Sequence, residues 1–332
     1  MNETDLHRPY ETLKTWHDSH IEKHQTSNSE LNHFHDIVMQ RLFDIALSVV
    51  EEKLGPPPCR FSWFVMGSAG RFEQAIVSDQ DHGLVFQVSN EKSREYFREL
   101  GREISLGLYE IGYPYCDGDV MSSNPLWCKS EQEWEKQIGQ WLEEESFESI
   151  RFLLIFYDAR VLVGEKDDIT RFKQQLHQYI EKRPHFLYRL FENTRHVKKA
   201  VGVFRQILTE SHGSHAGYID MKHSGFFPYI NAIRLLAIKE NIVEPSTLVR
   251  LVKLCEFPEY KKLECYKVDF EKLLHFRLQH HEVSEVYDDV HYLNVKKLDK
   301  YERNEIKQVL RNGKKLQDYT GTVIKRMLDH EN

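Results

Sequence analysis

The amino-acid sequence predicts an α+β protein in which an N-terminal helix flanks a small mixed sheet and an all-helical domain follows. Two short apolar runs, residues 61–66 and 83–88, are typical of strands, and a Gly-Ser turn follows the first of them. Upstream, apolar residues recur at every third or fourth position, which indicates an amphipathic helix. Downstream of about residue 168 the spacing is helical throughout, and the alternation typical of strands is absent.

Composition limits the class of protein. With 332 residues and 40% hydrophobic content, the chain is long enough to form two or three packed units. A net charge of −7 lacks the basic surface of a nucleic-acid binder, so we expect no nucleic-acid partner. The five cysteines contain no Cys-x-x-Cys pair, which indicates free, mostly buried thiols in a reducing compartment. Without a secretory signal or an apolar run of about 18 residues, we expect a cytoplasmic protein that does not bind membranes.

The first 28 residues are polar, and we expect a loose or partly helical lead-in there. The apolar spacing that follows predicts an amphipathic helix over residues 29–54. The run Gly55-Pro56-Pro57-Pro58 ends this helix, because three successive prolines cannot continue it.

The two predicted strands carry the residues that indicate a chemistry. Asp79 and Asp81 stand at i and i+2 before the second strand, and in an extended chain such residues point to the same side. The two carboxylates can therefore share divalent cations. Gly67 and Ser68, in the turn after the first strand, offer backbone amides and a hydroxyl to phosphate oxygens. A cation site next to a phosphate cradle suggests nucleotide chemistry.

Further elements follow in chain order. A second amphipathic helix is predicted over residues 90–112, and a return strand over 113–121 would bring Asp117 or Asp119 towards the first two carboxylates. The pattern Ser130-x-x-Glu133 is a capping box, and the helix that it opens buries tryptophans in the core. Another apolar helix covers residues 147–156, and residues 158–164 resemble the element that closes the catalytic domain in the family described below.

The C-terminal half reads as a series of helices with one flexible linker, residues 211–217. The predicted helices cover residues 169–182, 186–208, 225–241, 246–254, 268–281 and 300–328.

Three ordered blocks resemble a known family. Gly67-Ser68, followed after ten residues by Asp79-x-Asp81, resembles the signature of the polymerase-β-like nucleotidyltransferase superfamily. The strings GSAGRFEQAIVSDQDHGLVF, CDGDVMSSNPLW and GYIDMKHSGFFPYINAIRLLAI resemble a narrower group of nucleotidyltransferases. Members of that group are often fused to CBS and cyclic-nucleotide-binding domains, and they are related to the catalytic part of PII-protein uridylyltransferases. The resemblance covers roughly residues 25–330.

The resemblance implies a domain map and a set of roles. Residues 1–55 would form the lead-in and helix, 56–166 the catalytic domain, and 167–332 a helical substrate-binding domain. Asp79, Asp81 and Asp119 would be the catalytic carboxylates and would hold two magnesium ions. The remaining implied contacts, to the phosphates or to the acceptor, come from Gly67, Ser68, Arg71 and Lys222.

Three of these assignments have alternatives. Asp117 lies two residues before Asp119 and faces the same way on a strand, although the family block favours Asp119. Arg71 either neutralises a phosphate or pairs with Glu73. Lys222 either reaches the substrate or pairs with the nearby Asp220.

The implied reaction is magnesium-dependent transfer of a nucleoside monophosphate from an NTP to a hydroxyl acceptor, with release of pyrophosphate. Similarity to PII uridylyltransferases makes a protein side chain one candidate for the acceptor. One rival is a catalytically idle nucleotide-binding regulator on the same fold. The other is a transferase of the aminoglycoside-modifying kind, whose cationic small-molecule acceptor would suit an acidic cleft. The sequence leaves the NTP base, the acceptor and the oligomeric state open.

Overall fold

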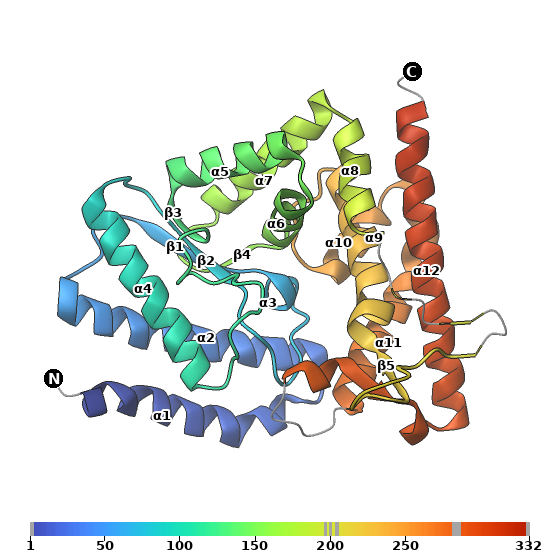
Figure 1. Ribbon diagram of the computed structural model, residues 1–332, viewed down its shortest axis with the longest axis horizontal. Coiled ribbons are helices and arrows are strands. Elements are labelled where there is room, and N and C mark those ends of the chain that lie inside the picture. Colours follow the sequence, from blue (N-terminus) through green and yellow to red (C-terminus); the bar gives the residue numbers. More distant parts are fainter. Residues whose placement is uncertain (1–2, 196–197, 199–200, 203–205, 281–286, 330–332) are drawn as a thin grey trace. The chain divides into compact units, whose positions relative to one another are not determined.

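The structure is a computed structural model that describes residues 3–195, 198, 201–202, 206–280 and 287–329. Contacts within the chain divide it into two compact units, each shown in Figure 1. The first contains residues 1–144 and 155–175, and the second contains residues 145–154 and 176–332. Within the described residues, no helix combines the length and the apolar character needed to cross a membrane.

A four-stranded mixed sheet forms the centre of the first unit. Its order is β3-β2-β1-β4. Strand β1 is antiparallel to both β2 and β4, whereas β3 runs parallel to β2. The strands are β1 (Phe61–Val65), β2 (His82–Phe86), β3 (Cys128–Ser130) and β4 (Arg160–Val163). The predicted small mixed sheet is therefore confirmed.

Helices cover both faces of this sheet (Figure 1). Successive residues of β1 point to opposite faces, as the pleat requires. Trp63 stacks on Phe43 of α2, while Phe64 meets Trp134 of α5 and Phe156 of α6 edge-on. The helices of this unit are α1 (Glu3–His20), α2 (Asn28–Leu54), α4 (Glu91–Glu110) and α5 (Glu131–Glu144). The end of α6 (Phe147–Tyr157) and the first part of α7 (Asp167–Lys182) also belong to it, whereas residues 147–154 and 176–182 of these two helices belong to the second unit.

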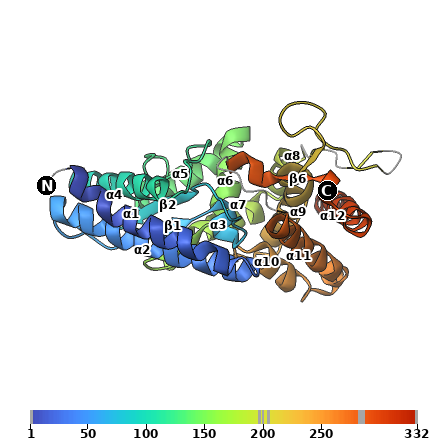
Figure 2. The same ribbon diagram turned by 90° about the horizontal axis from the view of Figure 1, so that it is seen from below.

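The N-terminal segment is more ordered than its composition predicts. Residues 3–20 form helix α1, and a short 3-10 helix (Ile21–His24) leads into α2. Figure 2 shows α1 and α2 running alongside each other. Tyr10 is buried and donates a hydrogen bond to Glu103 of α4, and Trp16 stacks on Phe34 of α2. These few aromatic contacts hold α1, although its sequence is polar overall.

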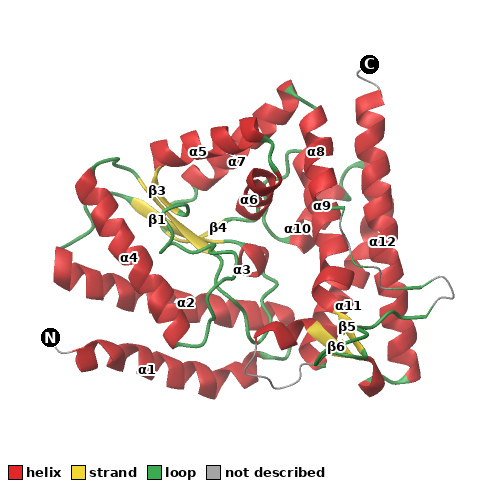
Figure 3. Ribbon diagram, viewed as in Figure 1, coloured by secondary structure: helices red, strands yellow, loops and turns green. Residues whose placement is uncertain are grey.

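The predicted return strand over residues 113–121 is wrong. Figure 3 draws the connection between α4 and β3 as loop, and the strand parallel to β2 is instead β3. Pro114 cannot donate a ladder hydrogen bond, and Asp119 adopts a left-handed φ of +53°, which a strand excludes. The Asp119 amide closes a tight turn on the Cys116 carbonyl at 2.9 Å.

The capping box is confirmed. The Ser130 amide and hydroxyl both donate to the Glu133 carboxylate, at 2.9 and 2.7 Å, and the Glu133 amide donates back to Ser130 Oγ. The helix that it opens, α5, buries Trp134 and Trp141, which pack against each other and against Trp127. The tryptophans therefore belong to the core, as predicted.

The second unit is built around helix α9. Almost every side chain of this helix is buried, and α10 and α12 pack against it. A π-helical segment (Lys222–Phe226) precedes it, and the Tyr229 hydroxyl donates to the Val309 carbonyl of α12 at 2.7 Å. The helices of this unit are α8 (His185–Asn193), α9 (Phe227–Lys239), α10 (Thr247–Leu254), α11 (Glu264–Gln279) and α12 (Lys300–Asp329), with 3-10 segments at Pro258–Leu263, Tyr287–His291 and Val295–Lys297.

Two details of this unit differ from the prediction. Helix α8 ends at Asn193 instead of continuing to Leu208, and several residues of that predicted stretch lie outside the described part. A two-stranded antiparallel ladder joins β5 (Tyr218–Asp220) to β6 (Tyr292–Asn294). Strands of three residues are too short to produce a recognisable alternation, so the sequence pattern did not reveal them.

Candidate functional site

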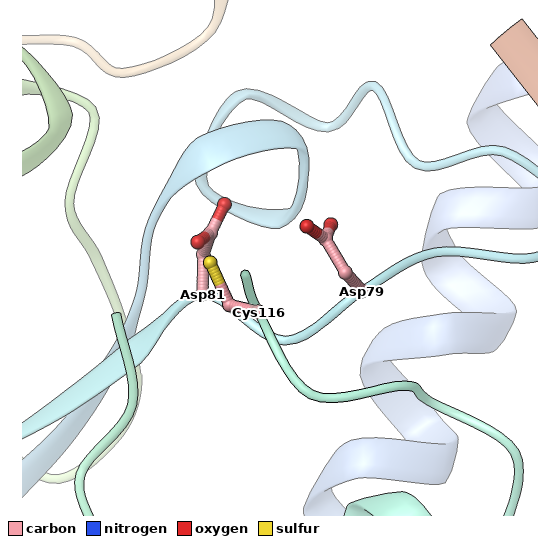
Figure 4. A group of neighbouring side chains, drawn as sticks. All are labelled: Asp79, Asp81 and Cys116. Carbon is pink, nitrogen blue, oxygen red and sulfur yellow. The ribbon is translucent and has the colours of Figure 1, made fainter. Parts of the chain in front are cut away.

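Asp79, Asp81 and Cys116 form a group beside the central sheet of the first unit. Their potential ligand atoms all lie within 4.8 Å of one another, and each residue is partly exposed. Figure 4 shows the two carboxylates and the sulfur gathered in front of the helical turn that follows β1. The structure therefore brings the two predicted aspartates together and adds a thiol to them.

Gln80 explains why the two aspartates face the same way. Its buried side chain donates hydrogen bonds to the carbonyls of Ser105 and Tyr113, at 3.1 and 2.9 Å. Its backbone amide donates to the Pro114 carbonyl at 3.1 Å. Since alternate residues of an extended segment point to opposite sides, the inward Gln80 turns its two neighbours outward. The aspartates lie in this extended approach to β2, just before the strand begins.

The loop that carries Cys116 is fixed on both sides of the thiol. Before it, the Tyr113 hydroxyl donates to His35 Nδ1 of α2 at 2.6 Å, while His35 Nε2 donates to the Ala75 carbonyl at 2.9 Å. After it, the Val120 carbonyl accepts from the His82 amide at 3.0 Å. The thiol therefore lies on a segment tied to both α2 and β2.

Gly67 lies in direct contact with Asp81. Its φ is +53°, and a Cβ placed on it would lie 1.9 Å from Asp81 Oδ2. The neighbouring Met66 amide donates to the Asp81 carbonyl at 2.7 Å. Only glycine meets both demands, the left-handed backbone and the missing side chain. Ser68 follows in the short helix α3 (Gly67–Arg71), so the predicted Gly-Ser turn lies against the aspartate segment.

Burial controls protonation around the site. Burial, followed by the charges of Asp81 and Asp79, raises the pKa of the Cys116 thiol to about 12, so the thiol keeps its proton and donates it to Asp81. Burial lowers the pKa of His82 to about 3, so this imidazole is neutral. Trp63 Nε1 donates to His82 Nδ1 at 3.2 Å, which leaves the proton on Nε2 to be donated to Gln80 Oε1 at 3.1 Å.

Asp119 does not belong to the group of potential ligands around Asp79 and Asp81 in the described residues. It is exposed, and its carboxylate accepts a hydrogen bond from Asn124 Nδ2 at 2.9 Å. Asp117 is also exposed. The return strand that was expected to align one of them with the first two carboxylates is absent.

The basic residues adopt other contacts. Arg71 is buried and pairs with Glu73 and Asp158, each at 2.7 Å, which favours the ion-pair alternative over the phosphate contact. Lys222 lies in the second unit, where its Nζ is 5.6 Å from the centroid of the Tyr287 ring.

Asp220 is not the partner that the sequence suggested for Lys222. Its carboxylate accepts from the amide and from Nδ1 of His223, both at 2.9 Å, and lies 3.6 Å from Lys198 Nζ.

The donor atoms fit a divalent cation. Carboxylate oxygens are the ligands that magnesium prefers, and Asp79 and Asp81 present them on one side of a fixed segment. A protonated thiol is a poor magnesium ligand, so Cys116 contributes to that fit only through its hydrogen bond to Asp81. Sequence reasoning missed Cys116, although it is the first residue of the block CDGDVMSSNPLW.

Two family models match the chain. One, described as putative nucleotidyltransferase DUF294, matches residues 15–148 and therefore includes Gly67, the two aspartates and Cys116. The other, described as putative nucleotidyltransferase substrate binding domain, matches residues 184–324. No curated protein matches the sequence significantly.

Proposed function

Because the chain belongs to the nucleotidyltransferase family that these two models describe, we propose that it moves a nucleoside monophosphate from an NTP to a hydroxyl acceptor and releases pyrophosphate. One observation carries the proposal. Two carboxylates lie close together, and one of them, that of Asp81, lies against a glycine that has no room for a side chain and that opens the turn assigned to phosphate. This arrangement suits a metal-bound triphosphate.

Each residue has a proposed role. Asp79 and Asp81 hold two magnesium ions, and Gly67 and Ser68 contact the β- and γ-phosphates through amides and a hydroxyl. Bound magnesium supplies Lewis-acid stabilisation of the charge that develops during in-line displacement at the α-phosphorus. Gln80 keeps the carboxylates in place before the cation arrives, because its side chain is bonded to two carbonyls behind them.

We propose Asp119 as the third carboxylate, either as a metal ligand or as the base that takes the proton of the acceptor hydroxyl. Its exposure makes it accessible to an incoming acceptor. Its bond to Asn124 has to be exchanged for that contact when substrates bind. A variant at this position is therefore the sharpest test of the assignment.

The acceptor is proposed to bind to the helical unit. The second family description, substrate binding domain, supports this assignment. Following the resemblance to PII uridylyltransferases, we propose a side-chain hydroxyl of a protein as the acceptor and Lys222 as a residue that contacts substrate. An aminoglycoside-like acceptor is the alternative that the same assay detects.

Incubation with each α-labelled NTP, magnesium and a cell lysate tests the proposal, with Asp79→Asn as the matched inactive variant. We expect label from one NTP to appear on a protein band or a small molecule, and to be absent with the variant. Magnesium-dependent nucleotide binding without any transfer would favour the idle regulator. The absence of both binding and transfer would contradict the proposed function.

A further inference from the structure

Cys116 differs from a cysteine that merely fills a core. Figure 4 shows its sulfur beside the carboxylate of Asp81, and this sulfur lies within 4.8 Å of a carboxylate oxygen of each aspartate. By comparison, Cys128 in β3 donates to the Phe97 carbonyl at 3.3 Å. Cys116 is partly exposed, as are both aspartates, so an ion from solvent can reach all three.

The mixed donor set distinguishes between cations. Magnesium takes oxygen ligands and keeps several waters, so it has no use for sulfur. Zinc, cadmium and cobalt accept thiolate together with carboxylate, and zinc sites with three protein ligands keep a fourth position open. We infer that Asp79, Asp81 and Cys116 form an inhibitory site for thiophilic divalent cations that excludes magnesium from the same aspartates. This inference rests on the proposed function in treating the aspartate pair as the metal site.

The observed separations allow such binding. With metal–sulfur and metal–oxygen bonds of about 2.3 and 2.1 Å, tetrahedral ligands lie roughly 3.5 Å apart. Side-chain rotations that close the group by about 1 Å are therefore sufficient. Binding replaces the S–H bond of Cys116 with a sulfur–metal bond, and the released proton passes to solvent. Because both aspartates are shared, the two kinds of cation compete.

Titration of the nucleotide-free chain with cobalt(II) tests the inference directly. We expect a sulfur-to-cobalt charge-transfer band in the near ultraviolet that saturates with cobalt and is reduced by excess magnesium. Cys116→Ser should lose the band and, by calorimetry, bind cadmium at least about tenfold more weakly. Loss of a residue that only hydrogen-bonds to a metal ligand already lowers metal affinity by that factor. Cys265→Ser is the matched control, because this exposed thiol donates only to the Lys262 carbonyl in the described structure, and it should keep the band.

The outcomes separate this inference from the proposed function, because cobalt binding needs neither nucleotide nor acceptor. No band in the wild type, or a band that survives in Cys116→Ser, overturns the inference even when transfer is observed. Circular dichroism checks that Cys116→Ser is folded. Should it not fold, Asp79→Asn provides the second test, and an unchanged cobalt affinity in that variant also overturns the inference.

Discussion

Gly67→Ala is expected to damage the site far more than it damages the fold. The backbone at this position has a φ of +53°, and holding an L-residue there costs about 1–2 kcal/mol. For a unit of this size, that corresponds to a melting temperature lower by roughly 2–8 °C. The larger effect is steric, because the new methyl group would lie 1.9 Å from Asp81 Oδ2.

Asp81 would have to move by about 1 Å to reach the 3.0 Å below which Cβ contacts are essentially never found. A displacement of that size can reduce a rate by about 10²-fold when the moved group positions the reacting atoms. We therefore expect magnesium-dependent transfer to fall by about two orders of magnitude, measured with the labelled NTP that the wild type uses. Magnesium-dependent nucleotide affinity, measured by calorimetry, should fall as well.

Gly112→Ala is the control that separates the effect of backbone strain from the effect of the steric contact with Asp81. Its φ of +104° is also unfavourable for alanine, but a Cβ there meets nothing within 4 Å. This control should lose stability and keep its nucleotide affinity. Wild-type affinity in Gly67→Ala, or an equal loss of affinity in Gly112→Ala, would refute the reasoning that Gly67 serves the position of Asp81.

The other predictions concern individual charges. Asp79→Ala should abolish magnesium-dependent NTP binding. Its melting temperature without metal should be unchanged or slightly higher, since neighbouring carboxylates repel each other without a cation. A large drop in that melting temperature would mean that the aspartate pair has a structural role. Asp119→Asn should lower transfer by about 10²–10⁴ with little change in NTP affinity, and Asp117→Asn should be nearly silent; the reverse result would reassign the third carboxylate. Arg71→Met should lower the free energy of unfolding by about 3–5 kcal/mol in denaturant titrations, because two buried carboxylates lose the guanidinium that neutralises them. A variant of unchanged stability with weaker phosphate binding would contradict the ion-pair role. His82 has a lowered pKa of about 3, so as the pH drops from about 6.5 towards 3 the unfolded state binds a proton at this residue before the folded state does, and stability should fall. In unfolding curves, the stability of His82→Gln should decline less steeply with falling pH. An identical pH dependence in the two proteins would argue against the buried neutral imidazole.

The parts of the site that could be predicted from sequence are those fixed by local spacing. Asp79 and Asp81 are two residues apart in an extended segment, so their common direction follows from backbone geometry alone. The bonds between Ser130 and Glu133 follow in the same way from a three-residue spacing in a helical first turn. In both cases, the interacting groups are held together by one short stretch of chain.

The features that the sequence did not predict correctly depend on contacts between segments that are distant in the chain. The sequence predicts a return strand over residues 113–121, but Gln80 and His82 hold this stretch as a loop through contacts that no local pattern records. Cys116 looks like any apolar thiol in the sequence, and only the folded loop places it beside Asp81. Helix α1 is similar, since the contact of Tyr10 with Glu103 joins positions 93 residues apart.

The order of the site before any cation binds follows from a chain of hydrogen bonds. Trp63 of β1 donates to His82, His82 donates to Gln80, and Gln80 donates to the Tyr113 carbonyl of the loop that carries Cys116. Each donor in this chain is buried, so breaking any link would leave an unsatisfied polar group away from water, at a cost of about 1–3 kcal/mol. That cost opposes the tendency of two close carboxylates to separate. The sheet core thereby sets the spacing of the carboxylates, which is why a substitution at His82 is expected to weaken metal binding although the imidazole does not touch the ion.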